Sequence, residues 1–339
     1  MFLSLQEPYI IAEVGQNHQG SIQEALKYVN IFSSLGANAV KFQIRDNKVL
    51  FDDSIYSQIY NSENSFGETY GEHREFLELN KEDFYQIKET CISNDTDLII
   101  TPFDLPSLEF CLQLKVDALK IASFDLGNIP FLEKMAKSGL PIVMSTGGGT
   151  FDQIRVSVEA ITKFNPDLAL LHCVSHYPCP PEKVRLGRIR QLIEEFPEVT
   201  IGISDHFNGI LTGPLSHQMG AQVFEKHVTF DRSAKGTDHP FSLEPDGFRR
   251  FVRDIKRAKI MTQNFEPNDL GQEPVFQKLG KSLVASCFIP KDTILTSDHL
   301  DGKIFRPAVI PVRESNTVIG KIVNRDVLAG EPINFSVLS

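Results

Sequence analysis

Two histidines at the ends of two apolar runs are the residues in this sequence most suited to chemistry. Residues 199–203 lead to His206, and residues 221–224 lead to His227. Polar residues at the carboxyl end of a buried strand are how a parallel α/β barrel builds its active site. Two imidazoles on neighbouring strand ends, each with a carboxylate nearby, predict a site for one divalent metal ion. The alternative is that each histidine only caps its strand through a hydrogen bond.

Short apolar runs alternate with amphipathic runs between residues 9 and 263, as is typical of buried parallel strands and their helices. The predicted strands are residues 10–14, 39–42, 98–101, 118–121, 141–145, 168–173, 199–204 and 223–227. Helix-like stretches include residues 22–35, 81–93, 129–138, 151–164 and 184–196. Eight such units in about 250 residues predict a TIM barrel and not an open doubly wound sheet. No Gly-x-Gly-x-x-Gly follows the first strand, which argues against dinucleotide binding.

The chain is predicted to have three parts, a barrel domain (1–263), a linker (264–277) and a small C-terminal domain (278–339). Pro267, Gly271 and Pro274 break the periodicity in the linker. The small domain contains β-like runs at residues 282–286, 317–324 and 333–337. A long loop, residues 46–80, follows the second strand, and we expect it to act as a lid or substrate-binding element.

Composition excludes several kinds of partner. The 339 residues are 41% hydrophobic, and no apolar stretch approaches the ~20 residues that a membrane span requires. Residues 1–8 lack a basic start and a long apolar core, so no signal peptide is expected. Five cysteines without paired metal spacing fit a reducing cytoplasm. A formal net charge of −10 argues against a nucleic-acid or anionic-membrane surface.

Polar residues stand near the carboxyl end of every predicted strand, and in a barrel they converge on one mouth. They include Glu13, Lys41, Gln43, Thr101, Asp104, Lys120, Ser123, Asp125, Ser145, Ser175, Tyr177, Ser204, Asp205, His206, Lys226 and His227. Lys41 and Lys120 lie in apolar strands, where a buried lysine is costly without an anion. Together with Ser123, Ser145 and the backbone of residues 146–149, they predict a cradle for a phosphate or carboxylate.

At these positions the sequence resembles the sialic acid synthases, which condense phosphoenolpyruvate with an N-acetylmannosamine-type sugar. The matching segments include residues 11–20 (IAEVGQNHQG), 41–43 (KFQ), 101–104 (TPFD), 120–123 (KIAS), 145–147 (STG), 171–173 (LHC), 202–206 (GISDH), 225–227 (EKH) and 236–239 (GTDH). Residues 278–285 begin a segment similar to that family's antifreeze-like (SAF) domain, so the resemblance covers essentially the whole chain. It implies a TIM barrel followed by a small SAF domain.

The resemblance also implies roles for individual residues. His206 and His227 match the family's metal ligands, usually for manganese or magnesium, and Glu13 matches a carboxylate near the reacting centres. The residues expected to contact phosphoenolpyruvate are Lys41, Thr101, Lys120, Ser123, Ser145, Ser175 and Ser204. Those expected to contact the sugar are Gln43, Asp125, Tyr177, Asp238 and Arg306.

The match departs from the family in two places. Ser175 stands where some members have asparagine. The glycines that often follow the family's Arg-Pro pair are replaced by Ala308 and Val309 after Arg306, and both residues resist backbone angles that glycine permits. The family is expected to form a homodimer in which the SAF domain of one chain covers the partner's barrel and supplies this arginine.

The segment at residues 69–74 (TYGEHR) bears on which sugar is the substrate. It looks more like the animal-type branch of the family, which accepts a 6-phosphorylated sugar. His73 and Arg74 could meet that phosphate, since arginine suits bidentate phosphate contacts, or could be solvated loop charges. A synthase of a related nonulosonate, of legionaminate or Kdn type, is an alternative. So are a Schiff-base aldolase at Lys120 or Lys226, which would need no metal, and a non-catalytic barrel carrying an ice-binding or interaction module.

Overall fold

The computed structural model describes residues 1–3, 5–264, 266 and 271–339, and two compact units form within it. The first unit spans Met1–Thr262 and the second Gln263–Ser339. Each unit is described by itself. Part of the predicted linker, namely residues 265 and 267–270 with Pro267, lies outside the described residues.

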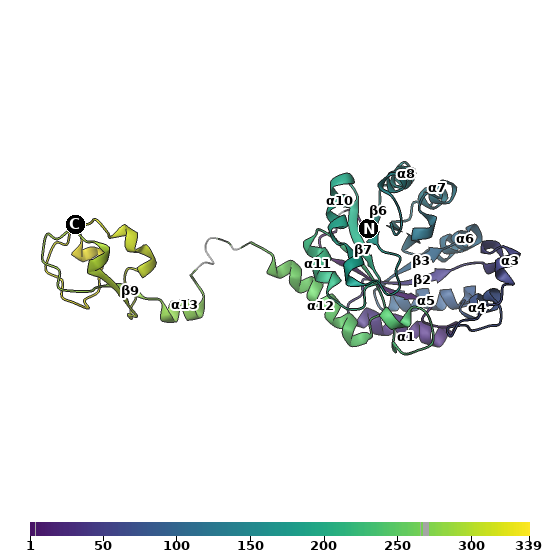
Figure 1. Ribbon diagram of the computed structural model, residues 1–339, viewed down its shortest axis with the longest axis horizontal. Helices are drawn as coiled ribbons and strands as arrows, with labels where there is room; N and C mark the ends of the chain where they lie inside the picture. Colours follow the sequence, from purple (N-terminus) through teal and green to yellow (C-terminus); the bar gives the residue numbers. More distant parts are fainter. Residues whose placement is uncertain (4, 265, 267–270) are drawn as a thin grey trace. The chain divides into compact units, whose positions relative to one another are not determined.

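Eight parallel strands close on themselves in the first unit (Figure 1). They are β1 (Tyr9–Gly15), β2 (Ala39–Ile44), β3 (Asp97–Pro102), β4 (Ala118–Ile121), β5 (Ile142–Ser145), β6 (Leu168–Cys173), β7 (Thr200–Asp205) and β8 (Val223–His227). The last strand pairs with the first, with Tyr9 opposite Val223 and Glu13 opposite His227. This is the predicted TIM barrel, and each predicted strand is present to within two residues at either end.

Helices surround the barrel and cover the outer face of its strands (Figure 1). They are α1 (Ile22–Ser34), α5 (Lys81–Ser93), α6 (Leu105–Leu114), α7 (Ile129–Lys137), α8 (Phe151–Thr162), α9 (Pro181–Val184), α10 (Gly187–Glu195), α11 (Thr212–Gln218) and α12 (Pro245–Met261). In α12 the spacing of Phe248, Phe251, Val252 and Ile255 puts four buried side chains on one helical stripe. The N-termini of α5 and α8 are fixed by capping boxes, in which Asn80 and Thr150 cap the first turn.

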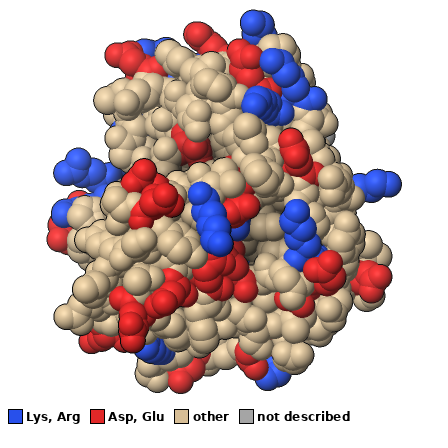
Figure 2. Space-filling view, turned by 90° about the vertical axis from the view of Figure 1, so that its right-hand side faces the viewer, with Lys and Arg blue, Asp and Glu red and all other residues tan. Residues whose placement is uncertain are grey.

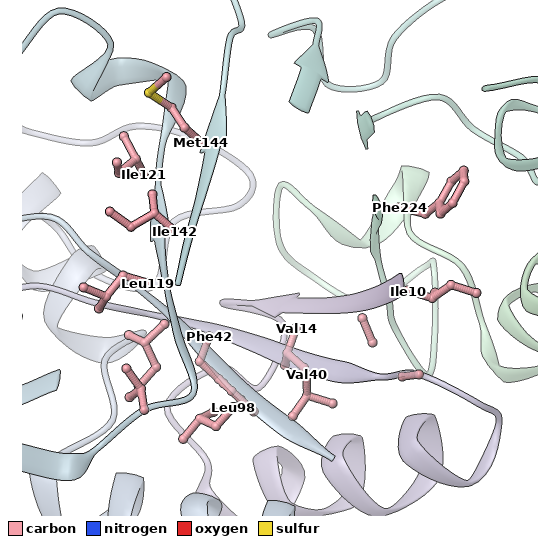
Figure 3. Packing of buried hydrophobic residues seen from close by; sticks show 14 of the residues in the cluster. Ile10, Val14, Val40, Phe42, Leu98, Leu119, Ile121, Ile142, Met144 and Phe224 are labelled. Carbon is pink, nitrogen blue, oxygen red and sulfur yellow. The ribbon is translucent and has the colours of Figure 1, made fainter. Parts of the chain in front are cut away.

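Alternate residues of each strand pack into two separate apolar layers. The outward-facing layer, which contacts the helices, includes Ile10, Val40, Leu98, Leu119, Ile142 and Phe224 (Figure 3). The inward-facing layer fills the amino-terminal half of the barrel with Tyr9, Ile11, Ala39, Ile99, Ala118, Val143, Ala169, Leu171 and Val223, joined by Phe2. This packed interior is a floor, and the side chains farther along the same strands stand above it.

The predicted long loop after β2 is largely structured. It contains three short helices, α2 (Asn47–Leu50), α3 (Asp53–Tyr56) and α4 (Tyr70–Phe76). Thr69 and Glu72 form a capping box at α4, and Tyr60, Tyr70 and His73 pack their rings together. We call residues 46–80 the β2 insertion.

The second unit is a small β-rich body with its own apolar cluster, which includes Leu283, Ile289, Val318, Val323 and Ile333. Its elements are α13 (Pro274–Leu279), β9 (Ser282–Ala285), β10 (Leu300–Lys303) and the 3-10 turns η4 (Ser297–His299), η5 (Val312–Thr317) and η6 (Phe335–Val337). The predicted strand at 282–286 is confirmed as β9, which pairs with β10 in an antiparallel sheet. The strands predicted at 317–324 and 333–337 are wrong, because these segments form 3-10 turns and isolated bridges.

No helix in the described parts of the chain combines the length and the apolar character needed to cross a membrane. On the face of the molecule seen in Figure 2, lysine and arginine side chains are interspersed with aspartate and glutamate side chains. The molecule therefore presents both charge signs there.

Candidate active site

A cavity of about 820 Å³ opens above the apolar floor, at the carboxyl ends of the strands. Most of the side chains predicted from the sequence line it. They are Glu13, Lys41, Gln43, Arg74, Thr101, Lys120, Ser123, Ser145, Tyr177, Ser204, His206, His227 and Asp238. Residues far apart in the sequence are thus brought to one mouth by strand order alone.

The alternation of side chains along β8 decides which residues enter the cavity. Glu225 and His227 point inward, whereas Lys226 lies between them and points to the outer side. Lys226 is fully buried there, with its Nζ 2.6 Å from Asp205 Oδ2. It also donates to the carbonyl of Phe207. Of the two lysines considered for a Schiff base, Lys226 does not line the cavity and Lys120 does.

Four buried charged side chains lie at the bottom of the cavity, directly above the apolar floor. Lys41 Nζ lies 2.8 Å from Glu13 Oε2 and 3.7 Å from Glu225 Oε1. Lys120 donates to Ser145 Oγ at 2.7 Å. All four charged side chains are at most 3% exposed. Two lysines and two carboxylates balance each other, so this inner cluster of Glu13, Lys41, Lys120 and Glu225 carries no net charge when all are ionised.

The pKa values of the two carboxylates in the inner cluster are shifted in opposite directions. Burial raises the pKa of Glu13 and the nearby Glu225 raises it further, although Lys41 opposes both. Burial alone would also raise the pKa of Glu225, but Lys120 and Lys41 outweigh it and lower that pKa to about 2. A pair of carboxylates whose pKa values are driven apart is a common arrangement for proton transfer. The pKa of Glu225 is thus lowered and that of Glu13 raised within one cluster.

A chain of side chains holds Glu13 in place from the β2 side. Gln43 Nε2 donates to Glu13 Oε1 at 2.9 Å, and Arg45 donates to Gln43 Oε1 at 2.5 Å. Arg45 Nε lies 3.3 Å from Glu78 of the β2 insertion. Gly15, with φ of +55°, allows this packing, because a Cβ there would lie 3.3 Å from Glu13 Oε1.

The two histidines meet at the mouth of the cavity, with ring centroids 5.3 Å apart. His206 Nδ1 lies 2.9 Å from the carbonyl of Val174, so Nδ1 carries the proton and Nε2 keeps its lone pair. Burial lowers the pKa of His227 to about 3, and its Nδ1 has no hydrogen-bond partner among the described residues. Tyr177 and Phe241 pack against both rings.

These two imidazoles fit a divalent metal when both rings are neutral, because each can then offer a ring nitrogen. No third His, Cys, Asp or Glu of the described chain completes a metal-binding cluster with them. A metal held here would therefore take its other ligands from water or substrate, as catalytic metal sites do.

Four predicted site residues do not line the cavity. His73 is buried within the β2 insertion, where its Nδ1 accepts from the amide of Phe66 at 3.2 Å. Asp125 accepts from Asn128 at 2.9 Å on the rim. Ser175 lines a neighbouring cavity, and Arg306 belongs to the second unit, where it is exposed.

The sequence reasoning assigned no role to several residues that line the cavity. These include Gln16, Arg45, Asn64, Tyr70, Cys173, Glu225 and Thr237. The position of Glu225 in the cavity could have been predicted, since it stands two residues before His227 and a period of two places both side chains on the same face of a strand. Asn64 and Tyr70 reach the cavity only through the fold of the β2 insertion, for which the sequence carries no periodic signal.

A closed βα barrel with a charged cavity at the carboxyl ends of its strands has the architecture of a TIM-barrel enzyme. Residues 28–266 match the model of the NeuB family. The chain belongs to the NeuB family, which places it among the synthases of sialic acids and related nonulosonates.

Relatives and solved structures agree with this assignment. An N-acetylneuraminate-9-phosphate synthase from Homo sapiens is 34% identical over 319 residues, covering 93% of this chain and 88% of that protein. An N,N'-diacetyllegionaminic acid synthase from Legionella pneumophila is 32% identical, covering 95% of this chain and 92% of that protein. The crystal structure of a sialic acid synthetase from Leptospira borgpetersenii matches with a TM-score of 0.69 and 33% identity, covering 80% of this chain and 90% of that one.

Proposed function

We propose that this protein condenses phosphoenolpyruvate with an N-acetylmannosamine-type sugar, giving a nonulosonic acid and phosphate. The observation that carries the proposal is the inner cluster, in which Glu13, Lys41, Lys120 and Glu225 lie buried beneath two histidines in one cavity. The names of the relatives, which are synthases of N-acetylneuraminate 9-phosphate and N,N'-diacetyllegionaminic acid, support the same class of reaction.

Phosphoenolpyruvate is proposed to occupy the floor of the cavity. Lys41 and Lys120 supply positive charge in a site from which water is excluded, so they stabilise the phosphate and carboxylate groups strongly. Thr101, Ser123 and Ser204 also line the cavity and offer hydroxyl groups. The Lys120 ammonium already donates to Ser145, which orients it toward one wall.

The chemistry follows from the substrates. The methylene carbon of phosphoenolpyruvate attacks the aldehyde carbon of the open-chain sugar, and the aldehyde oxygen takes up a proton. Water then adds, with loss of a proton, to the adjacent carbon, which carries the phosphate ester. The bond from that carbon to the bridging oxygen breaks, the hydroxyl group loses its proton, and phosphate leaves as the ketone forms. We assign Glu13 to accept the proton from the water, because it is the carboxylate whose pKa is raised.

A divalent manganese or magnesium ion is proposed at His206 and His227. When bound, it supplies Lewis-acid polarisation of the sugar carbonyl. Asp238 Oδ2 lies 3.7 Å from His227 Nδ1, beyond hydrogen-bond distance, at the same side of the cavity. Removing metal with a chelator should abolish phosphate release, and adding manganese or magnesium should restore it. The variant H227Q should lose bound metal by elemental analysis, whereas H217Q, changed on the outer helix α11, should retain it.

We further propose that the sugar carries a 6-phosphate. Arg74 lines the cavity, and its buried Nε has no hydrogen-bond partner among the described residues. Arg45 lines the same cavity and stacks its guanidinium 4.4 Å from the ring of Phe103. Two arginines on one wall suit a phosphate monoester. His73 is not part of this proposed subsite, since its ring packs inside the β2 insertion.

Phosphate release by the metal-loaded protein tests these proposals. The panel is N-acetylmannosamine, its 6-phosphate, mannose 6-phosphate and a diacetamido trideoxy hexose. The 6-phosphate of N-acetylmannosamine should give the highest kcat/KM. R74Q should raise the KM for that sugar at least about tenfold and leave the KM for phosphoenolpyruvate unchanged, whereas K81Q, at the exposed start of α5, should change neither. A preference for the free sugar would refute the phosphate subsite.

A Schiff-base aldolase at Lys120 is the second candidate, because burial lowers the pKa of this lysine and it faces the cavity. Borohydride trapping with pyruvate distinguishes the Schiff-base aldolase from the condensing synthase. Covalent modification of Lys120 would support the aldolase. Sensitivity to chelator without modification would support the synthase.

We also propose that the second unit is a SAF domain and that the protein is a homodimer in which Arg306 serves the partner's barrel. The side chain of Arg306 is exposed, and it donates only to the carbonyl of Lys278, at 3.4 Å, among the described residues. Sedimentation analysis should give a dimer. Mixing R306A with an inactive E13Q chain should restore activity through hybrid dimers, and a fully active monomer would overturn the arrangement.

A further inference from the structure

A second cavity, of about 520 Å³, lies beside the β5 and β6 strand ends. Ser175, expected from the sequence to contact phosphoenolpyruvate, lines this cavity and not the reaction cavity, and the cationic residues of its lining have no role in the proposed reaction. It is lined by the loop after β5, by the segment after β6 and by residues of α9 and α10. Its lining contains three cationic side chains, Lys183, Arg185 and Arg188, and no acidic residue. Such a concentration of positive charge without partners is typical of an anion site.

Two of the three cations of this cavity, Arg188 and Lys183, make contacts that position their side chains. Arg188 donates to the carbonyl of Gly149 at 2.8 Å, and its guanidinium stacks 4.8 Å from the ring of Phe151. Lys183 Nζ lies 3.2 Å from His176 Nε2. Arg185 occupies the left-handed region, with φ of +48°, a conformation that non-glycine residues adopt mainly where the fold requires it.

A buried histidine gives a second, independent sign of a ligand. His172 is 2% exposed and lines this cavity. Its Nε2 is 2.7 Å from the carbonyl of Val184, so Nε2 carries the proton and Nδ1 is left as an acceptor. Nδ1 has no hydrogen-bond partner among the described residues. A ligand that offers both negative oxygens and one O–H group would satisfy the arginines and this nitrogen together, and hydrogen phosphate is such a ligand.

Only a thin wall separates this cavity from the reaction cavity. Cys173 lines both. Gly147 stands between Ser123 of the reaction cavity and Ser175 of the second, since a Cβ at Gly147 would lie 2.7 Å and 2.4 Å from their hydroxyl oxygens. Ser123 is among the residues proposed to contact phosphoenolpyruvate in the reaction cavity. The second cavity therefore adjoins the place where phosphate is released.

We propose that this second cavity binds inorganic phosphate and receives the product phosphate as it leaves the reaction cavity. The receiving role rests on the proposed function. The binding of phosphate does not, because the cationic lining and the unpartnered His172 nitrogen are present whatever the barrel catalyses. Of the anions that could bind here, we propose free phosphate, since the proposed reaction releases that dianion on the other side of Gly147.

Calorimetric titration of inorganic phosphate into the full-length protein tests the site without turnover. Phosphate should bind in the presence of saturating phosphoenolpyruvate and without sugar. R188Q should weaken this binding at least tenfold, and R188K, which keeps the charge, should restore most of it. R190Q is the matched control, because Arg190 lies on the same helix, is exposed and does not line the cavity. Thermal unfolding of each variant checks that the fold is kept.

Three results would overturn the proposal. Phosphate binding that saturating phosphoenolpyruvate abolishes would assign the cavity to the substrate site. Equal phosphate affinity in R188Q and R190Q would show that the cationic lining of the second cavity does not bind phosphate. Tighter binding of glucose 6-phosphate than of inorganic phosphate would identify a sugar-phosphate site and exclude the product role. If the proposed synthase activity fails while phosphate still binds as expected, the site stands and only its receiving role is lost.

Discussion

Two buried acid–lysine groups lie on opposite sides of the same barrel wall, and they differ in whether their charges are satisfied. On the outer side, Lys226 lies 2.6 Å from Asp205, which also accepts from Thr212 and from the amide of Phe207. On the inner side, Glu225 Oε2 has no hydrogen-bond partner among the described residues, and the cluster faces a cavity. Neighbouring residues in one strand thus serve two purposes.

The difference shows how to separate a structural ion pair from a functional one. A buried pair whose hydrogen bonds are complete has nothing left to offer a ligand, and removing one partner leaves an uncompensated charge. A buried cluster that faces a cavity keeps hydrogen-bonding atoms free to bind a substrate, and its main contribution is to that binding and not to the stability of the fold. Changes to the outer pair should therefore affect folding, and changes to the inner cluster should affect turnover.

Substitution of the inner carboxylates is expected to have the largest effect. E13Q and E225Q should each lower kcat at least about 10³-fold, because the first removes the proton acceptor and the second removes the fixed anion between two lysines. Both proteins should stay folded, since glutamine keeps the shape of the side chain. Steady-state phosphate release and thermal unfolding measure the two quantities. Full activity in E13Q would remove Glu13 from the mechanism.

Substitution of the outer lysine should give the opposite pattern. K226M should lower the free energy of unfolding by about 3–5 kcal/mol, because Asp205 is left buried without its cation. The kcat of the protein that remains folded should match the unsubstituted chain. Denaturant unfolding of K226M and of the double variant D205N/K226M checks this, and the double variant should recover part of the loss. A K226M protein of normal stability and lost activity would contradict the structural role.

The pH dependence of the reaction should report Glu13. Since burial raises its pKa and the reaction needs its ionised form, kcat/KM should fall with decreasing pH below a midpoint that lies above the usual glutamate pKa. Gln43 donates a hydrogen bond that lowers the pKa, so Q43L should move the midpoint to higher pH, by up to about one unit. A midpoint that does not move in Q43L would show that another group controls the acid side.

The smallest effect is expected on stability in acid. Lys120 and Lys41 hold the pKa of Glu225 at about 2 against the effect of burial. A lowered carboxyl pKa contributes stability above the unfolded-state pKa, near 4.5, and this contribution is lost as the pH falls toward 2. The free energy of unfolding should therefore decline more steeply between these values in the unsubstituted chain than in E225Q. Equal slopes would contradict the ionised state assigned to Glu225.

Much of the barrel and its mouth could be predicted from the sequence, because buried parallel strands are short apolar runs and their carboxyl ends are marked by polar residues. The same rule placed Lys41, Lys120 and His206 correctly at the cavity. It treated Glu225 only as a carboxylate beside His227, because its place in the cavity between Lys41 and Lys120 follows only when the period of two along the strand is applied. His73 was proposed for the site from the resemblance of residues 69–74 to the animal-type branch, and an insertion without periodicity gives no direction for its side chains.

The second unit was harder to predict for a related reason. Its apolar residues Ile289 and Val323 lie at single bridges and not in long strands. Short apolar runs at 317–324 and 333–337 therefore resembled strands, although the chain reverses within them. Local sequence carries little record of such pairing, which depends on contacts between distant segments.

The most direct test of the central claim uses phosphoenolpyruvate labelled with oxygen-18 at the bridging position. Condensation at the inner cluster breaks the carbon–oxygen bond, so phosphate released in the presence of the sugar 6-phosphate should carry the label, as mass spectrometry or phosphorus NMR can show. Release should stop without sugar. Unlabelled phosphate would mean that the phosphorus–oxygen bond is broken. Either that result or release that does not depend on sugar would mean that the cavity is not the site of a condensing synthase.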